Sequence, residues 1–174
     1  MGYSTMKRDH SHFLGPIGGL GGKAANNLAK ETDLAICVGT KLADFTTGSW
    51  ANFENPEFKL VSINIARHDA NKHLAEAVIG DAKVCLSELS NSLGNWKSPD
   101  SWHKKSQDEL KSWNEYVDKE SGPTNQETPN YAHAVGAIYR NSDPTDIAVT
   151  AAGGLVGEVV QVWRPKELNT HETE

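Results

Sequence analysis

One apolar run constrains the fold of this chain more than any other feature. Residues 34–38 read Leu-Ala-Ile-Cys-Val, and Gly39 follows them. A short apolar run that stops at a glycine is typical of a strand buried on both faces of a parallel sheet. The runs KLVSINIA at 59–66 and EAVIGD at 76–81 indicate two more strands. The sequence therefore predicts an α/β fold, a parallel sheet with helices on both faces.

Helices are expected on both sides of these strands in the sequence. Small apolar residues recur at helical spacing from Ala24 to Ala29, just before the first strand. After the third strand, Asp81 can cap a helix, AKVCLSELSNSL, that Gly94 can end. The apolar side of that helix is expected to hold Val84, Cys85, Leu86 and Leu89. Residues 40–58 read as a long loop, and 68–73 as a polar connection with room for one helical turn.

The composition changes after Gly94, and the chain is expected to leave its first domain there. Ser98-Pro99 is a suitable helix start. The apolar residues that follow lie roughly on one helical face: Trp102, Leu110, Trp113 and Val117. Residues 121–130, SGPTNQETPN, have the composition of a linker. We therefore expect a linker with an amphipathic helix over 95–128.

A second α/β unit is expected from residue 129 onward. Its predicted helix is Tyr131–Arg140, with Ala134, Ala137 and Ile138 on the core side. A strand over 146–151, a helix in VGEVVQVW and a polar tail follow. Because a single strand cannot bury itself, this unit is predicted to be incomplete and the chain to be a segment of a longer protein. The alternative is that the last strand joins the first sheet as an edge.

Composition excludes several classes of protein. The net charge is −6 and no basic cluster occurs, which argues against nucleic acid as a partner. No apolar window is long enough to span a membrane, and the first residues do not resemble a signal peptide. Cys37 and Cys85 lie inside apolar patterns and read as buried free thiols. A cytoplasmic α/β protein is expected.

Two segments have the character of a nucleotide pocket. The glycine-rich run at 15–22 precedes a helix, where bare backbone N–H groups can approach an anion. The loop at 39–48 is rich in hydroxyl groups and follows a strand, where α/β sheets bind ligands. The candidate pocket residues are Gly18, Gly19, Gly21, Gly39, Thr40, Lys41, Asp44 and Thr47. The alternative is structural, with a tight helix entry, turn-capping hydroxyls and Asp44 capping a local helix.

A third glycine-containing segment follows the last predicted strand. Gly153, Gly154 and Leu155 stand between that strand and a helix, so their amides can contact a diphosphate. The alternative is a simple tight turn between strand and helix. His68 and His73 flank Asp69 and Lys72, but no third ligand for a metal is suggested, so a solvated connection is favoured. No catalytic nucleophile and no metal ligand are predicted.

The order of these motifs resembles the thiamine-diphosphate-dependent enzymes of the acetolactate synthase type. The resemblance rests on the glycine run before AAN, on DLAICVGT, on DFTTG, on INIARHDA and on GDAKVCLSEL. Three stretches, VGTKLADFTTGSW, INIARHDANKH and TAAGGLVGE, are similar to the branch that hydrolyses a carbon–carbon bond of a cyclic diketone in inositol breakdown. The resemblance covers nearly the whole chain.

This resemblance implies a domain assignment. Residues 1–94 would be the C-terminal part of a Rossmann-like central domain, 95–128 the linker, and 129–174 the incomplete beginning of the domain that binds the cofactor diphosphate. The glycine run and the loop at 39–48 correspond to regions that contact FAD in some relatives. Hydrolases of this type are not expected to need FAD, so the pocket would be vestigial or structural.

The resemblance also implies the chemistry of a longer parent enzyme. That parent would use thiamine diphosphate and Mg²⁺ to open the ring of its substrate. The Gly-Asp-Gly cofactor motif and the glutamate that activates the cofactor are absent, so the isolated chain is expected to bind no cofactor and to be inactive. Relatives assemble as dimers and tetramers, so a homo-oligomer is expected. The alternatives are a free-standing nucleotide-binding module and an oligomerisation unit with an exposed apolar face over 129–164.

Overall fold

The architecture is taken from a computed structural model that describes residues 6, 9–165, 167–168 and 170–173. Its larger sheet has three parallel strands in the order β1 (Leu34–Val38), β2 (Lys59–Asn64) and β3 (Glu76–Ile79). Leu34 is opposite Lys59, and Val61 is opposite Glu76. The predicted parallel α/β sheet is confirmed, and β1 and β3 are its two edges.

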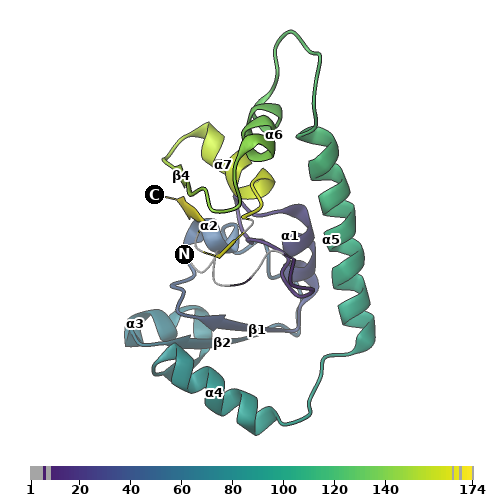
Figure 1. Ribbon diagram of the computed structural model, residues 1–174. Coiled ribbons are helices and arrows are strands. Elements are labelled where there is room, and N and C mark those ends of the chain that lie inside the picture. The colour runs from purple at the N-terminus through teal and green to yellow at the C-terminus, as the bar shows by residue number, and fades with distance from the viewer. Residues whose placement is uncertain (1–5, 7–8, 166, 169, 174) are drawn as a thin grey trace.

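Helices flank this sheet (Figure 1). α1 (Lys23–Glu31) lies above the sheet in this view and α4 (Ala82–Leu93) lies below it. The predicted ends of α4 are confirmed, because the Asp81 carboxylate accepts a hydrogen bond from the Val84 amide at 3.1 Å and Gly94 follows with φ +55°. No residue of α4 is buried.

The apolar side predicted for α4 is only half right. Cys85 and Leu89, four residues apart, are partly buried, whereas Val84 and Leu86 are exposed. Residues at i and i+4 share a face, and neighbours one position away point elsewhere. Cys85 contacts the end of β3, where a Cβ atom built on Gly80 would lie 2.7 Å from Sγ. Both cysteines are free, and both are half-buried.

Short helical turns follow the carboxyl ends of β1 and β2. The predicted loop after β1 contains α2 (Asp44–Thr47). Ala43, not Asp44, is the N-cap of α2, so the idea that Asp44 caps this helix is wrong. The connection after β2 contains α3 (Arg67–Ala70) and the 3₁₀ turn η2 (Lys72–Leu74), which agrees with the expected helical turn.

The long helix α5 (Asp100–Glu120) runs along one side of the whole molecule (Figure 1). One part of it packs against α1. Farther along, Val117 is buried and Trp113 packs beside it. The amphipathic helix expected in the linker is therefore present, and its apolar face continues into the core of the next unit.

The C-terminal unit contains α6 (Tyr131–Asn141), β4 (Ala148–Thr150), α7 (Gly154–Val162) and β5 (His171–Thr173). Strand β4 pairs with β5 in parallel. The prediction of an unpaired strand is therefore wrong, and so is the alternative that it joins the first sheet. The partner strand lies in the predicted polar tail, whose residues HET carry no apolar pattern that would reveal a strand.

The core face predicted for α6 is wrong. Ala134, Ala137 and Ile138 are exposed, and Ile138 keeps 62% of its surface in contact with solvent. The buried residues are Ala132, Val135 and Gly136. Gly136 decides the orientation, because a Cβ atom at that position would lie 2.0 Å from the carbonyl oxygen of Ser121. This close backbone contact turns the more apolar face of α6 toward solvent.

The main apolar cluster lies between α5, α6 and α7. It contains Val117, Ala132, Val135, Val159, Val162 and Trp163. The three-stranded sheet is less well covered, since Leu34 and Ile36 on β1 remain 47% and 43% exposed. Among the described residues, no helix is long and apolar enough to cross a membrane.

Candidate functional site

The loop after β1 is held at the carboxyl edge of the sheet by backbone contacts. The Gly39 amide donates to the carbonyl of Ile63 at 2.9 Å, with Gly39 at φ +65°. The Asn64 side chain donates to the carbonyl of Thr40 at 3.1 Å. Lys72 Nζ lies 3.5 Å from the carbonyl of Lys41. The predicted site residues 39–41 are therefore placed at the strand end, as expected, and tied to β2 and η2.

The hydroxyl groups of this loop stabilise its own turns. Thr40 Oγ1 accepts from the Leu42 amide at 3.3 Å. Thr47 is 3% exposed, and its Oγ1 donates to the carbonyl of Asp44 at 3.3 Å and accepts from the Trp50 amide at 3.2 Å. The Asp44 carboxylate accepts from Ser49 Oγ at 3.2 Å. These contacts are the turn-capping role that the structural alternative describes.

The glycine run packs directly against this loop. The Gly19 amide donates to the carbonyl of Phe45 at 2.7 Å, and the Gly21 amide donates to the carbonyl of Gly18 at 2.9 Å. A Cβ atom on Gly18 would lie 1.9 Å from the carbonyl oxygen of Phe45. The structure therefore brings the two predicted pocket segments together, and it uses their amides for protein contacts.

Two asparagines that the sequence analysis did not single out connect these segments. Asn26 of α1 accepts from the Gly18 amide at 2.8 Å and donates to the Gly18 carbonyl at 3.0 Å. Asn52, itself buried, donates to Asn26 Oδ1 at 3.0 Å. The pattern of a glycine turn followed by an asparagine eight residues later was the available signal.

The connection after β2 is more ordered than a solvated loop. Asp69 and Lys72 form an ion pair at 2.7 Å, and the hydrogen bond from Lys72 holds the pKa of the Asp69 carboxyl below its usual value. His73 stacks on Trp50, with ring centroids 4.2 Å apart. Within the described part of the chain, no three side chains are grouped so as to hold a metal ion.

The third candidate segment is an open turn at the start of α7. Gly153 has φ +139° and is the N-cap, without a side-chain cap for the first helical amides. Gly153, Gly154 and Leu155 are exposed. Nearby, Thr150 Oγ1 is buried and has no hydrogen-bond partner among the described atoms. Uncapped amides at a helix N-terminus are suited to an anionic group.

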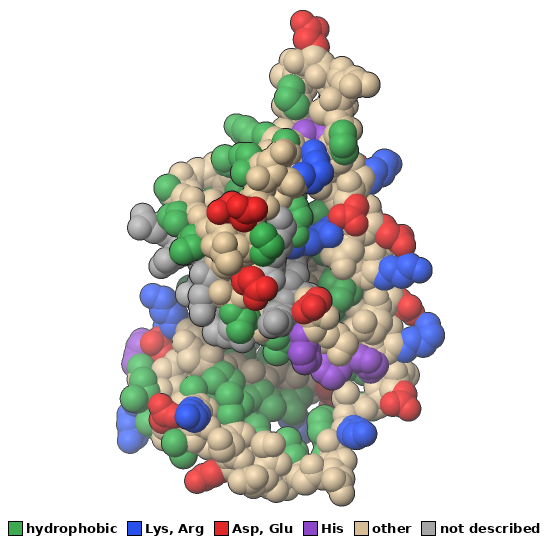
Figure 2. Space-filling model, viewed as in Figure 1, with side chains coloured by type: hydrophobic (Ala, Val, Ile, Leu, Met, Phe, Trp, Pro, Cys, Tyr) green, Lys and Arg blue, Asp and Glu red, His purple; other side chains and the backbone are tan. Residues whose placement is uncertain are grey.

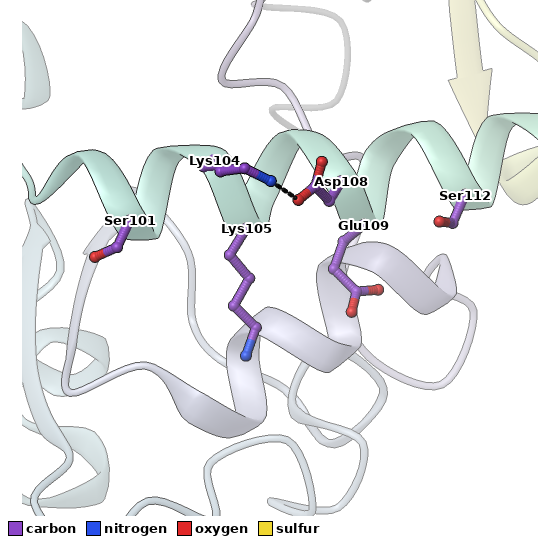
Figure 3. A pocket seen from close by; sticks show the side chains of 6 residues that line it. All are labelled: Ser101, Lys104, Lys105, Asp108, Glu109 and Ser112. Atoms are coloured by element: carbon purple, nitrogen blue, oxygen red, sulfur yellow. Dashed lines mark hydrogen bonds and ion pairs between the residues drawn. The ribbon is translucent and has the colours of Figure 1, made fainter.

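The glycine run at 15–22 and α7 touch each other. A Cβ atom on Gly157 would lie 3.4 Å from Leu20 Cδ2, so the first unit and the C-terminal unit meet there. A cavity of about 320 Å³ elsewhere contains no predicted site residue. It lies along α5 and is lined by polar side chains: Ser101, Lys104, Lys105, Asp108, Glu109 and Ser112 (Figure 3).

The charged groups along this cavity already have partners. Lys104 pairs with Asp108 at 2.7 Å, and Lys105 pairs with Glu31 of α1. Glu109 accepts from Asn27 of α1 at 2.9 Å. Figure 3 shows Lys105 and Glu109 reaching from α5 toward α1. The cavity is therefore a seam between two helices and offers no unpaired charge to a ligand.

A parallel sheet with loops at its carboxyl edge and a following glycine turn define an α/β cofactor-enzyme domain, and sequence comparison identifies which. Residues 1–89 match the family described as "Thiamine pyrophosphate enzyme, central domain", about half of the 174 residues. The chain therefore belongs to the thiamine pyrophosphate enzymes, and the resemblance predicted from its motifs is confirmed.

Individual relatives extend the match to the rest of the chain. A 3D-(3,5/4)-trihydroxycyclohexane-1,2-dione hydrolase of Clostridium perfringens (strain 13 / Type A) is 31% identical over 196 residues, which cover 99% of this chain and 31% of that protein. Proteins of that name from Bacillus anthracis (strain CDC 684 / NRRL 3495) and, numbered 1, from Bacillus cereus are 32% and 33% identical, with 99% and 31% covered in each case. The chain spans about a third of the length of these relatives.

Proposed function

We propose that this chain serves a cytoplasmic hydrolase that opens the ring of trihydroxycyclohexane-1,2-dione in inositol breakdown. The observation that carries the proposal is the alignment of 99% of the chain with hydrolases named for that substrate. The described residues contribute a scaffold rather than the reacting groups. No catalytic residue is assigned to this chain, and it is proposed to be a segment of a longer enzyme.

The residues that would hold the cofactor diphosphate are Gly153, Gly154 and Leu155. The open, uncapped start of α7 fits an anion, because its first amides have no side-chain acceptor. When bound, thiamine diphosphate supplies a carbon nucleophile and an electron sink. We propose that Mg²⁺ and the remaining cofactor contacts come from outside this chain, so the chain alone binds the cofactor too weakly to detect.

The carboxyl-edge segments are proposed to be structural rather than an FAD site. The amides of Gly18, Gly19 and Gly21 all donate to protein acceptors, so an incoming phosphate would have to displace those bonds. Calorimetric titration of the chain with FAD, NAD and ADP tests this, and no heat is expected. Saturable heat with any one nucleotide would favour the free-standing nucleotide module instead.

Two measurements test the hydrolase proposal itself. The purified chain, with thiamine diphosphate and Mg²⁺ added, is expected to hydrolyse no ring substrate. Genomic DNA on both sides of the coding region is expected to continue in frame, with a Gly-Asp-Gly motif downstream. Ring hydrolysis by the 174-residue chain alone, or unrelated flanking DNA, would contradict the segment proposal.

A role in assembly is supported by one specific observation. Hydrophobic side chains gather on the surface of the C-terminal unit (Figure 2). The exposed members are Tyr131, Ile138, Ile147, Val149 and Leu155. Monomeric proteins rarely leave such a group uncovered. We propose that this surface packs against another copy of the chain or against the rest of a longer enzyme.

Light scattering of the chain tests the assembly proposal. A dimer or larger species is expected for the native sequence, and Ile138→Asp is expected to shift it toward monomer because a charge in a buried contact is costly. Leu74→Asp, at a fully exposed leucine of the first unit, is the matched control and should leave the mass unchanged. A native chain that is strictly monomeric at high concentration would overturn the homo-oligomer proposal.

A further inference from the structure

Strained backbone is concentrated at the carboxyl edge of the sheet. Among the described residues, the non-glycine positions with positive φ are Leu42, Ser49, Trp50, His73 and Leu74. Three belong to the loop after β1, and two belong to the connection after β2. Such conformations persist only where surrounding contacts enforce them, and they are common in clamps and switches.

Two of the strained residues stack on each other. The rings of Trp50 and His73 are 4.2 Å apart and inclined by 24°. His73 Nε2 lies 3.2 Å from the carbonyl oxygen of Leu42, a third strained residue. Phe53 supports the indole from another side, with ring centroids 5.1 Å apart. One imidazole therefore holds the loop after β1 by a ring contact and a hydrogen bond.

We propose that Trp50 and His73 form a proton-dependent clamp that fastens the loop after β1 to the connection after β2. A protonated imidazole over an indole gains a cation–π attraction. Its hydrogen bond to the Leu42 carbonyl also becomes charge-assisted and stronger. Histidine gains its charge between pH 8 and pH 5, so the clamp tightens as the pH falls through that interval.

The charged groups around His73 do not oppose its protonation. They are Lys41 and Asp44 of the loop after β1, Arg67, His68 and Asp69 of α3, Lys72 of η2, and Glu76 of β3. Their fixed charges balance, with three cations and three anions. Lys72 is neutralised by Asp69 at 2.7 Å. His73 is itself exposed, so water can solvate its second nitrogen.

The clamp is connected to the glycine run. The Phe45 carbonyl, in the clamped loop, accepts the hydrogen bond from the Gly19 amide. Opening of the loop would free that amide and the Trp50 amide, which donates to Thr47 Oγ1. Protonation of His73 therefore slows the opening of both glycine-run and loop contacts.

Amide hydrogen exchange of the full chain tests the clamp. Protection factors, which correct for the pH dependence of intrinsic exchange, are compared at pH 8 and pH 5.5. The amides of Gly19 and Trp50 are expected to gain about threefold protection at the lower pH, the size of an exposed cation–π contact. His73→Gln keeps a side-chain donor for Leu42 but cannot gain charge, and is expected to abolish the gain.

A matched histidine and a second variant complete the test. His68→Gln changes a neighbouring exposed histidine that has no ring contact among the described residues, and should keep the threefold gain. Trp50→Leu removes the cation–π partner and should reduce the gain even though His73 is intact. Equal gains in the native chain and in His73→Gln, or loss of the gain in His68→Gln alone, would overturn the clamp.

Discussion

At the scale of single residues, the glycines of the first run are explained by close packing. Gly18 combines φ +95° with a contact that leaves no space for a side chain, because a Cβ atom would lie 1.9 Å from the Phe45 carbonyl oxygen. Gly15 has a similar φ of +89°, and nothing lies within 4 Å of its Cβ position. The same sequence letter therefore serves two different physical needs within four residues.

This difference leads to a stability prediction. Gly18→Ala is expected to lower the free energy of unfolding by at least about 2 kcal/mol, because it adds a backbone clash to the cost of positive φ. Gly15→Ala carries only the conformational cost, about 1 kcal/mol. Urea unfolding of both variants measures the difference. Equal losses would show that packing against Phe45 does not explain Gly18.

A pH-dependent prediction concerns the Asp69 carboxyl. Its pKa is lowered in the folded chain, first by the hydrogen bond from Lys72, so folding favours the ionised form. The resulting stabilisation is present above the unfolded pKa, about 3.9, and is lost as the pH falls through the lower folded pKa. Asp69→Asn should therefore flatten the fall in urea midpoint below about pH 4. A native and a variant curve that stay parallel from pH 6 to pH 3 would argue against this role.

At the scale of elements, the boundaries of strands and helices followed local chemistry and were predicted well. Asp81 and Gly94 mark the ends of α4 because capping depends on neighbouring backbone groups alone. The buried face of α6 was not predictable, since it depends on the approach of Ser121, fifteen residues away in sequence. β5 was missed because its pairing with β4 depends on tertiary contacts.

The candidate site divides in the same way. The sequence placed Gly39 and Thr40 at a strand end, and the structure has them there. It did not show that Asn26 and Asn52 would occupy the polar positions of the glycine run, because side-chain partners far apart in sequence leave no local pattern. The roles assigned to Gly153, Gly154 and Leu155 stay predictions.

Two helical glycines allow a test of helix packing. Gly136→Ala should destabilise the chain by about 2 kcal/mol or more, despite the higher helix propensity of alanine, because its Cβ would lie 2.0 Å from the Ser121 carbonyl oxygen. Gly157→Ala in α7 meets only the flexible end of Leu20 at 3.4 Å and should be neutral or stabilising by up to about 1 kcal/mol. Thermal unfolding followed by circular dichroism compares them. A stabilising Gly136→Ala would contradict the observed helix contact.

At the scale of the whole molecule, α5 joins the two units. Trp113 packs against the apolar cluster of the C-terminal unit, and its indole nitrogen would lie 2.9 Å from a Cβ atom on Gly22 at the start of α1. Arg164, which follows α7, pairs with Asp118 of α5 at 2.8 Å. The C-terminal unit is therefore anchored to the same helix that covers α1.

Cooperative unfolding depends on this shared helix. Trp113→Ala should cost at least about 2 kcal/mol and separate the single urea transition into two, because it removes a side chain that contacts both units. Trp96→Ala, at a tryptophan that is 65% exposed, should change stability by no more than about 0.5 kcal/mol. If Trp113→Ala unfolds in one transition at an unchanged midpoint, the units are not coupled through this residue.

The edge position of β1 has a consequence for how the chain behaves before it is fully folded. Its residues, LAICV, include neither a charge nor a proline, the usual means by which edge strands avoid pairing with other molecules. In a concentrated refolding mixture, the β1 segment of one molecule competes with β2 of its own chain for the β1 segment of another. Yield of soluble protein is then set by dilution and by the speed of β2 pairing, rather than by the stability of the finished fold.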